Sequence, residues 1–342
     1  MLKYLNDKNK LIETEIFLNK ANLRINNYYL FPANGYRMRC EFSFKDSKYI
    51  MFDRGKSIEI KSFTKAHPLI QNSMSELSKF LQTHVSLTKG LFQLNFRTNG
   101  NETLISFIYR KNIPENFLVL IEQLENNGFI RCLARAKGKL LSLTNNVITS
   151  EVSCGSTNYS LQHSDNSFYQ PNFYSLTCML NFINQHLTDC EDLLELYCGC
   201  GSFTIPLSQY FKNVFASDSN RDNINNLKIN LSTNKISNVK LARISDDEFS
   251  QALNGKEFKR LQNINIDSFN FSHVLVDPPR SGLTHSLAES LKRYKNIIYV
   301  SCNPKTFLRD LDALDHHKVK DLAVFDQFSN TDHLELIALL GK

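Results

Sequence analysis

From about Gln170 to its end, the 342-residue chain alternates short apolar stretches with segments of helical pattern. This alternation predicts an α/β fold in which crossover helices join the strands of a mostly parallel, doubly wound sheet. Residues 329–333 are too few for a crossover helix, so the last two strands are expected to form an antiparallel hairpin at one edge. The seven expected strands cover residues 193–197, 214–217, 239–243, 273–277, 297–301, 323–328 and 334–340.

The first half of the chain has a different pattern. After a short helical lead-in over residues 9–21, residues 36–44 alternate apolar and polar side chains, which is typical of a strand with one buried face. We predict two domains, an α+β domain with an antiparallel sheet over residues 1–165 and a Rossmann-like domain over residues 166–342. Further elements of the first domain are strands over residues 48–52, 57–63, 91–97 and 103–109, and helices over residues 67–82 and 114–127.

The positive charge of the chain is concentrated in its first half. Residues 1–160 contain 22 basic and 13 acidic side chains, whereas the remaining residues contain 18 and 21. A basic domain of this kind is expected to bind a polyanion such as RNA. Arg37 and Arg39 lie on the open face of the first strand, and Phe92 and Arg110 are further candidates for RNA contacts. For each of them, a solvated surface position is the alternative interpretation.

The sequence predicts a cytoplasmic protein. The N-terminal MLKYLNDKNK carries charges where an export signal is apolar, and runs such as residues 117–121 are far too short to cross a bilayer. The eight cysteines have no paired CxxC spacing, which favours reduced and mostly buried thiols over zinc or an iron–sulfur cluster. We therefore expect no metal and no membrane contact, and we expect a monomer.

A glycine-rich turn directly follows the first strand of the second domain, where Gly199 and Gly201 form a Gly-x-Gly pattern. Glycines allow a ligand to approach the backbone, and Asp218 at the end of the second strand is placed to bind ribose hydroxyls. A dinucleotide-binding loop would have Gly or Ala in place of Thr204, so the pattern favours S-adenosyl-L-methionine, which has no pyrophosphate. The alternatives are a plain strand-to-helix turn and a metal site at the neighbouring cysteines.

Three reactive side chains are predicted at the carboxyl edge of the same sheet. Asp277 ends the fourth strand in DPPRSG, and Cys302 follows the fifth strand, before a helix that begins at Pro304 and favours the thiolate. Glu335 lies between two leucines, where a buried base with a raised pKa can form. Arg280 stands where amino-group methylases have an aromatic residue and RNA cytosine-5 methylases a cysteine, which disfavours both chemistries. A rigid Pro-Pro loop, a buried apolar cysteine and a surface glutamate are the structural alternatives.

The motifs SFYQPN, LLELYCG, VDPPRSGL, SCNP and FDQF, followed by Glu335, resemble bacterial tRNA (uracil-5-)-methyltransferases, the RNA 5-methyluridine family. The similarity extends upstream through YRMR and LFQ, and so covers nearly the whole chain. It implies a class I methyltransferase domain that uses S-adenosyl-L-methionine, with Cys302 as nucleophile and Glu335 as base. Beside the two loop glycines, it implies cofactor contacts from Gln170, Tyr197, Ser202, Asp218 and Asp277. A contact of Asp277 with the uracil is the alternative to its contact with the cofactor.

The resemblance also implies the substrate, which is the T-loop uridine of tRNA at position 54, with tmRNA as a further substrate. The tRNA branch of the family usually has Asn where Cys200 and Ser202 stand, and Glu where Asp218 stands. A ribosomal-RNA uracil-5-methyltransferase is the enzymatic alternative. A tRNA-folding chaperone, for which methylation is secondary, is the alternative from another class.

The chemistry of uracil explains why these residue types are needed. Carbon 5 is a poor nucleophile, so the thiolate of Cys302 first adds to carbon 6 and enriches carbon 5 in electrons. Carbon 5 then takes the methyl group, Glu335 removes the remaining proton, and elimination releases Cys302. The target base must also be unstacked and turned out of its loop, with basic and aromatic side chains taking its place.

Overall fold

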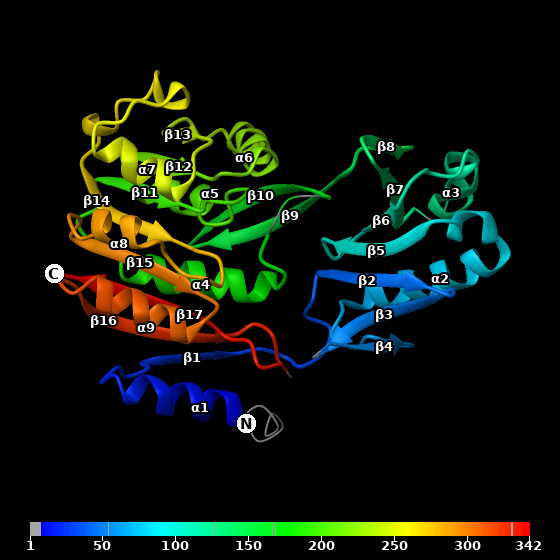
Figure 1. The fold of residues 1–342 in the computed structure, drawn as a ribbon, viewed down its shortest axis with the longest axis horizontal. Coiled ribbons are helices and arrows are strands. Elements are labelled where there is room, and N and C mark those ends of the chain that lie inside the picture. Colours follow the sequence, from blue (N-terminus) through cyan, green and yellow to red (C-terminus); the bar gives the residue numbers. More distant parts are fainter. Residues whose placement is uncertain (1–7, 54, 127, 166, 168, 330) are drawn as a thin grey trace. The chain divides into compact units, whose positions relative to one another are not determined.

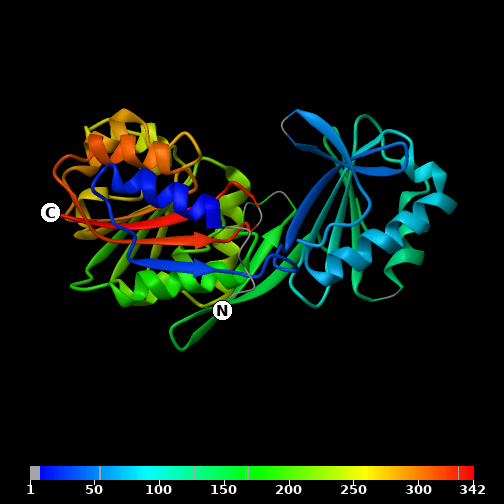
Figure 2. The same ribbon diagram turned by 90° about the horizontal axis from the view of Figure 1, so that it is seen from below.

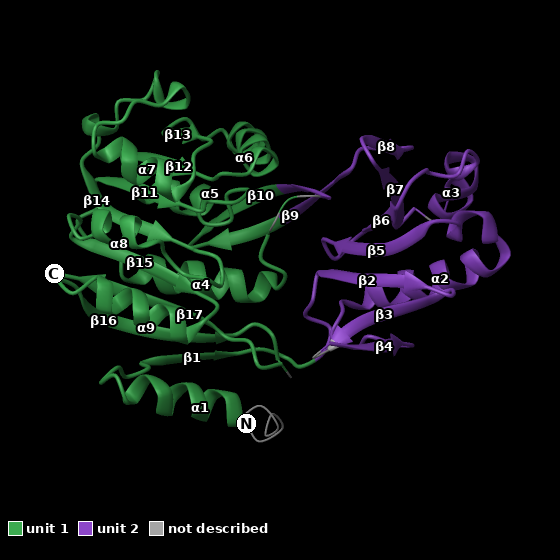
Figure 3. Ribbon diagram, in the orientation of Figure 1, with its two compact units in different colours: residues 1–33, 151–161, 167–342 green, residues 34–150, 162–166 purple. Residues whose placement is uncertain are grey.

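The computed structural model separates into two compact units (Figures 1 and 3). It describes residues 8–53, 55–126, 128–165, 167, 169–329 and 331–342. Unit 1 contains residues 1–33, 151–161 and 167–342, and unit 2 contains residues 34–150 and 162–166. This division differs from the expected single boundary at residue 165, because the N-terminal segment belongs with the C-terminal part of the chain.

Unit 1 is built on an eight-stranded sheet (Figure 1). Its strands are β1 (Asn27–Leu30), β11 (Asp192–Leu196), β12 (Asn213–Ser217), β13 (Val239–Ala242), β14 (Phe271–Val276), β15 (Asn296–Ser301), β16 (Lys318–Asp326) and β17 (Glu335–Gly341). Their order is β1-β16-β17-β15-β14-β11-β12-β13, and all neighbours are parallel except β17, which is antiparallel to β15 and β16. The mostly parallel sheet and its seven expected strands are confirmed.

The eighth strand, β1, comes from the segment that the sequence pattern assigned to the other domain. It pairs in parallel with β16, and the ring of Tyr29 stacks on that of Phe325 with centroids 4.5 Å apart. The hairpin of β16 and β17 is present, but β1 covers its outer strand, so the hairpin does not form the edge. Such a pairing joins opposite ends of the chain and leaves no signal in local periodicity.

Helices cover both faces of this sheet (Figure 2). They are α1 (Lys8–Asn19), α4 (Phe173–Gln185), α5 (Thr204–Leu207), α6 (Arg221–Thr233), α7 (Asp246–Leu253), α8 (His285–Leu291) and α9 (Pro304–Ala313), with short 3-10 turns at Ser208–Tyr210, Lys259–Leu261 and Ile266–Ser268. Leu18 of α1, Phe249 of α7 and Phe307 of α9 belong to one core, together with residues of α8. Residues of α4, α5 and α6 form the core on the other face.

Unit 2 is built on a seven-stranded sheet. Its strands are β2 (Arg39–Lys45), β3 (Lys48–Asp53), β4 (Lys56–Ile60), β5 (Leu91–Thr98), β6 (Thr103–Tyr109), β7 (Ile130–Ala136) and β8 (Lys139–Ser142), in the order β4-β3-β2-β5-β6-β7-β8. The neighbours are antiparallel except β6 and β7, which are parallel and are connected by α3 (Phe117–Glu125). The expected antiparallel sheet therefore contains one parallel pair.

The core of unit 2 lies between one face of this sheet and its helices. Helix α2 (Pro68–Thr83), followed by a 3-10 turn at Val85–Thr88, contributes Leu77, and α3 contributes Ile121. The predicted alternation of the first strand is present, since Phe42 and Phe44 are buried in this core. Strands β9 (Val147–Cys154) and β10 (Thr157–Ser164) form a separate pair, along which the chain passes from one unit to the other. In the part of the chain that the structure describes, no helix is long and apolar enough to cross a membrane.

Candidate active site

The predicted cofactor loop follows β11 at the carboxyl edge of the unit 1 sheet. Gly199 (φ 56°) and Gly201 (φ 95°) both have left-handed backbone conformations, which disfavour residues that carry a Cβ atom. Gly201 also has no space for one, because a Cβ atom would lie 2.4 Å from Cδ1 of Leu227 on α6. The second glycine therefore allows α6 to pack directly against the loop. Ser202, the next residue, is partly buried in the same turn.

Asp218 connects this loop to the end of β12. Its Oδ2 atom accepts hydrogen bonds from the backbone N of Gly199 at 3.0 Å and from Nδ2 of Asn223 at 3.1 Å. Its Oδ1 atom accepts one from the backbone N of Asn220 at 2.7 Å. A carboxylate can accept about four hydrogen bonds, so Asp218 retains capacity for a ligand hydroxyl. Asp218 thus lies beside the glycine turn, as expected, and it also organises that turn.

Tyr197 begins the loop with a left-handed φ of 61°, an uncommon conformation for a residue of this size. Its hydroxyl donates a hydrogen bond to Oδ2 of Asp246 at 2.8 Å, and the same oxygen accepts one from Oγ1 of Thr284 at 3.2 Å. Burial and the nearby carboxylates raise the pKa of Tyr197, so it remains a neutral donor. Asp246 and Thr284 hold the tyrosine in place, and the sequence pattern did not predict either residue.

Gln170 is buried just ahead of α4, whose N-cap is Asn172. Its Oε1 atom accepts a hydrogen bond from Nε2 of Gln327 at 3.1 Å, and Nδ2 of Asn172 donates to the backbone O of Gln327 at 3.3 Å. A hydrogen bond from Gln327 also reaches the carboxyl of Glu335. The predicted cofactor residue Gln170 is therefore linked through Gln327 to the predicted base.

Cys302 and Glu335 are neighbours across two strands. In the antiparallel pair of β15 and β17, Ser301 lies opposite Leu336, so the next residues along the two strands fall beside each other. Cys302 is partly buried directly after β15, and Glu335 is 6% exposed at the start of β17. The topology brings together the predicted nucleophile and the predicted base.

The carboxyl groups around Cys302 bind protons more tightly than usual. Burial and, to a smaller extent, the carboxylate of Asp277 raise the pKa of Glu335 to about 8, although hydrogen bonding by Gln327 and the charge of Arg280 oppose the rise. Burial also raises the pKa of Asp277 to about 7. Both groups can therefore exchange protons near neutral pH, which is the property required of a general base.

The thiol of Cys302 differs from the sequence expectation. Its place before α9 predicts a stabilised thiolate, but burial and the carboxylates of Glu335 and Asp277 raise its pKa to about 11, opposed by the Arg280 guanidinium. A helix terminus contributes about 0.3–1 kcal/mol, which is less than desolvation and two adjacent acids together. At neutral pH the thiol is therefore protonated, and its activation requires a change in the surrounding charge.

A cavity of about 500 Å³ lies beside Cys302. Its other lining residues come from α1 (Lys10, Glu13, Thr14, Phe17), from the loop after β14 (Arg280), from the start of α9 (Asn303, Pro304, Lys305) and from the segment before β17 (Asp332, His333). The N-terminal helix, which the sequence pattern treated as a lead-in, thus forms a wall of the cavity beside the predicted nucleophile. Lys10 also binds the carboxylate of Asp326 and donates to the backbone O of Phe328 at 3.1 Å, which fastens α1 to the segment before Glu335.

Glu195 is a further residue of this edge that the sequence pattern did not single out. It is 1% exposed in β11, directly before the cofactor loop, and burial raises its pKa to about 8, with contributions from Asp277 and Asp218. Among the residues that the structure describes, its Oε2 atom has no hydrogen-bond partner. A buried acid of this kind favours a cationic ligand nearby. Its sequence signal is a single acid within an otherwise apolar strand.

The cysteines beside the loop glycines are buried thiols. Cys198 and Cys200 are 5% and 1% exposed, and the backbone O of Cys200 accepts a hydrogen bond from Nδ2 of Asn230 at 2.9 Å. Among the described residues, no His, Cys, Asp and Glu side chains gather in threes in a way that could hold a metal ion. The structure therefore favours a packing role for these two cysteines.

The four predicted RNA contacts all lie in unit 2, where 17 basic side chains face 10 acidic ones. The Arg110 guanidinium lies over the ring of Phe92, with 5.8 Å to the centroid. Nε of Arg37 donates to the backbone O of Arg39 at 2.9 Å, and Arg39 pairs with Glu41. The structure thus brings them together as two pairs, one at β2 and one at the start of β5 and the end of β6.

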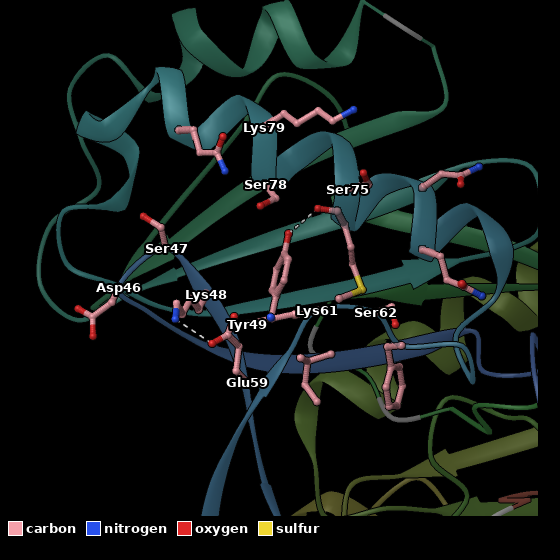
Figure 4. A pocket seen from close by; sticks show the side chains of 16 residues that line it. Asp46, Ser47, Lys48, Tyr49, Glu59, Lys61, Ser62, Ser75, Ser78 and Lys79 are labelled. Atoms are coloured by element: carbon pink, nitrogen blue, oxygen red, sulfur yellow. Dashed lines mark hydrogen bonds and ion pairs between the residues drawn. The ribbon is translucent and has the colours of Figure 1, made fainter.

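Unit 2 contains a larger cavity of about 870 Å³, between α2 and the strands β3 and β4 (Figure 4). Its wall includes the ion pair of Lys48 and Glu59 at 2.8 Å, and Tyr49, whose hydroxyl donates to the backbone O of Met74 at 2.9 Å. The residues predicted as catalytic lie in unit 1 and do not line this cavity. Size alone therefore does not indicate the reaction site, because the predicted nucleophile lines the smaller cavity.

Comparison with known proteins identifies the family. The sequence matches the family described as tRNA (Uracil-5-)-methyltransferase over residues 2–342. The chain belongs to this family. Curated tRNA/tmRNA (uracil-C(5))-methyltransferases of Nitratiruptor sp. and Campylobacter concisus are 36% and 39% identical to it, over 90% and 89% of this chain and 87% and 85% of the relatives. Membership in the tRNA (uracil-5-)-methyltransferase family confirms the predicted enzyme class and its cofactor, S-adenosyl-L-methionine.

The fold is also shared with a solved structure. The crystal structure of Pyrococcus abyssi tRNA (uracil-54, C5)-methyltransferase in complex with S-adenosyl-L-homocysteine matches with a TM-score of 0.76. The match covers 99% of this chain and 84% of that chain, at 22% sequence identity. This likeness confirms the class I methyltransferase fold.

The residues at the carboxyl edge of unit 1 fit the family's cofactor. S-adenosyl-L-methionine carries a sulfonium and an ammonium group, and two acids of this edge would pair with them. These are the partly buried Asp277 and Glu195, whose Oε2 atom has no hydrogen-bond partner among the described residues. A bound cation favours the ionised form of such an acid. Asp218 retains capacity for a ribose hydroxyl, and the turn at Gly199 and Gly201 permits close approach to the backbone. The donor and acceptor set therefore matches the chemistry of the cofactor.

Proposed function

We propose that this protein methylates carbon 5 of the uridine at position 54, in the T loop of tRNA, through a covalent adduct between Cys302 and carbon 6 of the uracil. The observation that carries the proposal is the grouping of Asp277, Cys302 and Glu335 at one edge of the sheet. They lie at the ends of the adjacent strands β14, β15 and β17, of which β14 pairs with β11, the strand that precedes the cofactor loop. Family membership supports the reaction, and the names of the curated relatives support both tRNA and tmRNA as substrates. We place the protein in the cytoplasm as a monomer.

The first task of the site is to make carbon 5 nucleophilic. The Cys302 thiol gives its proton to a neighbouring carboxylate, and its sulfur forms a bond to carbon 6. The electron pair of the carbon 5–carbon 6 double bond then moves towards carbon 5 and the adjacent carbonyl. S-adenosyl-L-methionine supplies the methyl group that carbon 5 takes.

The second task is to release the product. After methylation, carbon 5 carries both the methyl group and its original proton, and Glu335 takes that proton. The electrons of the broken C–H bond re-form the double bond, and the carbon 6–sulfur bond breaks with its electron pair leaving on Cys302. With a pKa of about 8, Glu335 can hold this proton and then lose it to solvent.

The RNA must be bound with its target base turned out of the loop. We assign phosphate contacts to Arg37 and Arg39, and we assign stacking on unpaired bases to the pair of Phe92 and Arg110. The excess of basic side chains in unit 2 supports this assignment.

A tRNA that contains 5-fluorouracil tests the covalent mechanism. The wild-type protein should form a complex with it that survives a denaturing gel, because fluorine cannot leave carbon 5 as a proton does. Cys302→Ala should form no such complex and should bind the cofactor normally. Cys190→Ala is the control, since it removes another partly buried thiol, which precedes β11 at the end of that strand away from the cofactor loop. This variant should trap the RNA as the wild type does. Trapping by Cys302→Ala would exclude this nucleophile.

The substrate is tested separately, with labelled cofactor and purified RNA. Label should enter tRNA as 5-methyluridine, and a tRNA with cytidine at position 54 should accept none. Label that enters ribosomal RNA in preference to tRNA would favour the alternative substrate.

A further inference from the structure

Gln327 is a buried amide to which the proposed mechanism gives no part. It follows β16 within the motif FDQF and is 0% exposed. Its Nε2 atom donates to Oε1 of Gln170 at 3.1 Å, and a hydrogen bond from it lowers the pKa of Glu335. The amide thus lies between a predicted cofactor residue and the predicted base.

The backbone around Gln327 is held from three directions. Nδ2 of Asn172 donates to the backbone O of Gln327 at 3.3 Å, which ties it to the start of α4. Lys10 of α1 binds the carboxylate of the preceding residue, Asp326. Oγ of Ser329 donates to the backbone O of Phe31 at 2.9 Å. These contacts fix where the side-chain amide can lie.

A side-chain amide can serve both protonation states of a carboxyl group. Its nitrogen carries two N–H groups, so Gln327 can donate to Gln170 and to the carboxylate of Glu335 at the same time. Among the residues that the structure describes, its Oε1 atom has no hydrogen-bond partner, although it is buried. A protonated Glu335 has an O–H group that needs an acceptor, and half a turn of the amide about its last bond presents Oε1 to it.

We propose that Gln327 is a positioning residue for Glu335. Before proton transfer, the amide of Gln327 donates a hydrogen bond to the carboxylate of Glu335. After proton transfer, its Oε1 atom accepts a hydrogen bond from the carboxylic acid. The inference rests on the proposed role of Glu335 as the base. Asp277, Arg280 and the thiol of Cys302 are the other titratable or charged groups that interact with this carboxyl. Because Gln327 favours the carboxylate, its removal should slow the elimination step more than methyl transfer.

The test compares Gln327→Met, which keeps the length of the side chain and removes the amide, with Ser329→Ala, which loosens the same segment without touching Glu335. Each variant is mixed with ordinary tRNA and labelled cofactor in a single turnover, and the methylated protein–RNA adduct is measured on a denaturing gel. Gln327→Met should accumulate adduct and release product about 10-fold more slowly. This factor is smaller than the rate enhancement that a general base provides, because Glu335 itself is still present. Ser329→Ala should show a lower melting temperature and no adduct.

The pH profile separates positioning from folding. Without the amide, the acid limb of product release should move to higher pH in Gln327→Met, because the pKa of Glu335 rises, and it should stay unchanged in Ser329→Ala. Gln327→Glu keeps the size of the side chain and adds a neighbouring negative charge, so its acid limb should move further still. This second variant keeps the inference testable if Gln327→Met does not fold.

Glu335→Gln distinguishes the failure of this inference from the failure of the proposed function. If Glu335→Gln turns over normally, the base is wrong and the inference falls with it. If Glu335→Gln stalls as an adduct while the Gln327 variants release product at the wild-type rate and pH, only the role of Gln327 is excluded.

Discussion

The two halves of the carboxyl edge of unit 1 are built in opposite ways. In the cofactor half, polar groups are already paired within the chain, since Asp218 accepts three hydrogen bonds and the hydroxyl of Tyr197 is bound by Asp246. In the reaction half, the carboxyls of Asp277 and Glu335 have raised pKa values and together raise the pKa of Cys302. The binding half is preorganised, whereas the reaction half holds groups whose charges disfavour one another, as active sites commonly do.

This contrast predicts that binding and chemistry can be separated by substitution. A change in the reaction half should stop turnover and leave the cofactor affinity intact. A change in the cofactor half should lower the affinity for the cofactor and leave the rate of the chemical steps unchanged at saturating cofactor.

Glu335→Gln should give the largest effect, a loss of about 10²–10⁴-fold in turnover, as expected when a general base is removed. Cys302 should still add to uracil and the methyl group should still be transferred, so a methylated protein–RNA adduct should form from ordinary tRNA. The dissociation constant of Glu335→Gln for the cofactor, measured by calorimetry, should match that of the wild type. A folded variant with normal turnover would exclude Glu335 from the mechanism. A variant that binds the cofactor more weakly would show that the two halves are not independent.

Asp218→Ala is the matching change in the cofactor half. It leaves the backbone N–H groups of Gly199 and Asn220 without their acceptor, which costs about 1–3 kcal/mol, equivalent to about 5–150-fold in cofactor affinity. At saturating cofactor, the rate of a single turnover should return to within about 3-fold of the wild type, since the reaction half is unchanged. A lasting defect in that rate would show that the halves are coupled.

Local sequence patterns predicted most of the fold, because strands of a doubly wound sheet are short apolar runs separated by helices. The pattern missed β1, because its pairing with β16 joins distant parts of the chain. It also missed β7, in which Arg131 and Arg135 share one face of the strand with Leu133. Both arginines form ion pairs inside unit 2, with Glu102 and Asp165, so their burial depends on partners that periodicity does not reveal.

The candidate site was predictable where function depends on strand ends. Asp277 and Cys302 follow parallel strands, and parallel strands bring their carboxyl ends to one edge. Local patterns did not single out Lys10, and they assigned Gln327 no role beyond its place in the motif FDQF, because the positions of both side chains follow from tertiary contacts. The predicted direction for the pKa of Cys302 was also wrong, because the helix terminus is a local feature and the two neighbouring carboxyls are not.

Unit 2 is a third region for the comparison. Its basic side chains should contribute to RNA binding, but not to cofactor binding or to the chemical steps. Arg37→Ala combined with Arg39→Ala should weaken tRNA binding and reduce the slope of log affinity against log salt by about two, one for each lost phosphate contact. The charge-matched control is Lys240→Ala with Lys259→Ala, two exposed lysines of unit 1. If the control weakens tRNA binding equally, the assignment of these contacts to unit 2 is wrong.

Glu195 should affect the stability of the fold and have the smallest effect on turnover. It tests where the boundary between the halves lies, since its carboxyl interacts with both Asp277 and Asp218. Its pKa is raised from 4.5 to about 8, so folding takes up a proton over this interval. The contribution of Glu195 to the free energy of unfolding is therefore full below pH 4.5 and is lost as the pH rises to about 8, by up to about 1.4 kcal/mol per unit.

Glu195→Gln cannot lose that proton, so its melting temperature should fall less than that of the wild type between about pH 5.5 and about pH 8.5. Asp277 and Glu335 titrate in both proteins, so the difference between the two curves reports on Glu195 and its interactions with Asp277 and Asp218. Glu191→Gln, at a partly exposed position paired with Lys212, should follow the wild-type curve. Parallel curves for Glu195→Gln and the wild type would mean that Glu195 is ionised in the folded protein. The group of acids with raised pKa values would then include Asp277 and exclude Glu195. A flatter curve for Glu195→Gln would mean that this group also includes Glu195, next to the cofactor loop.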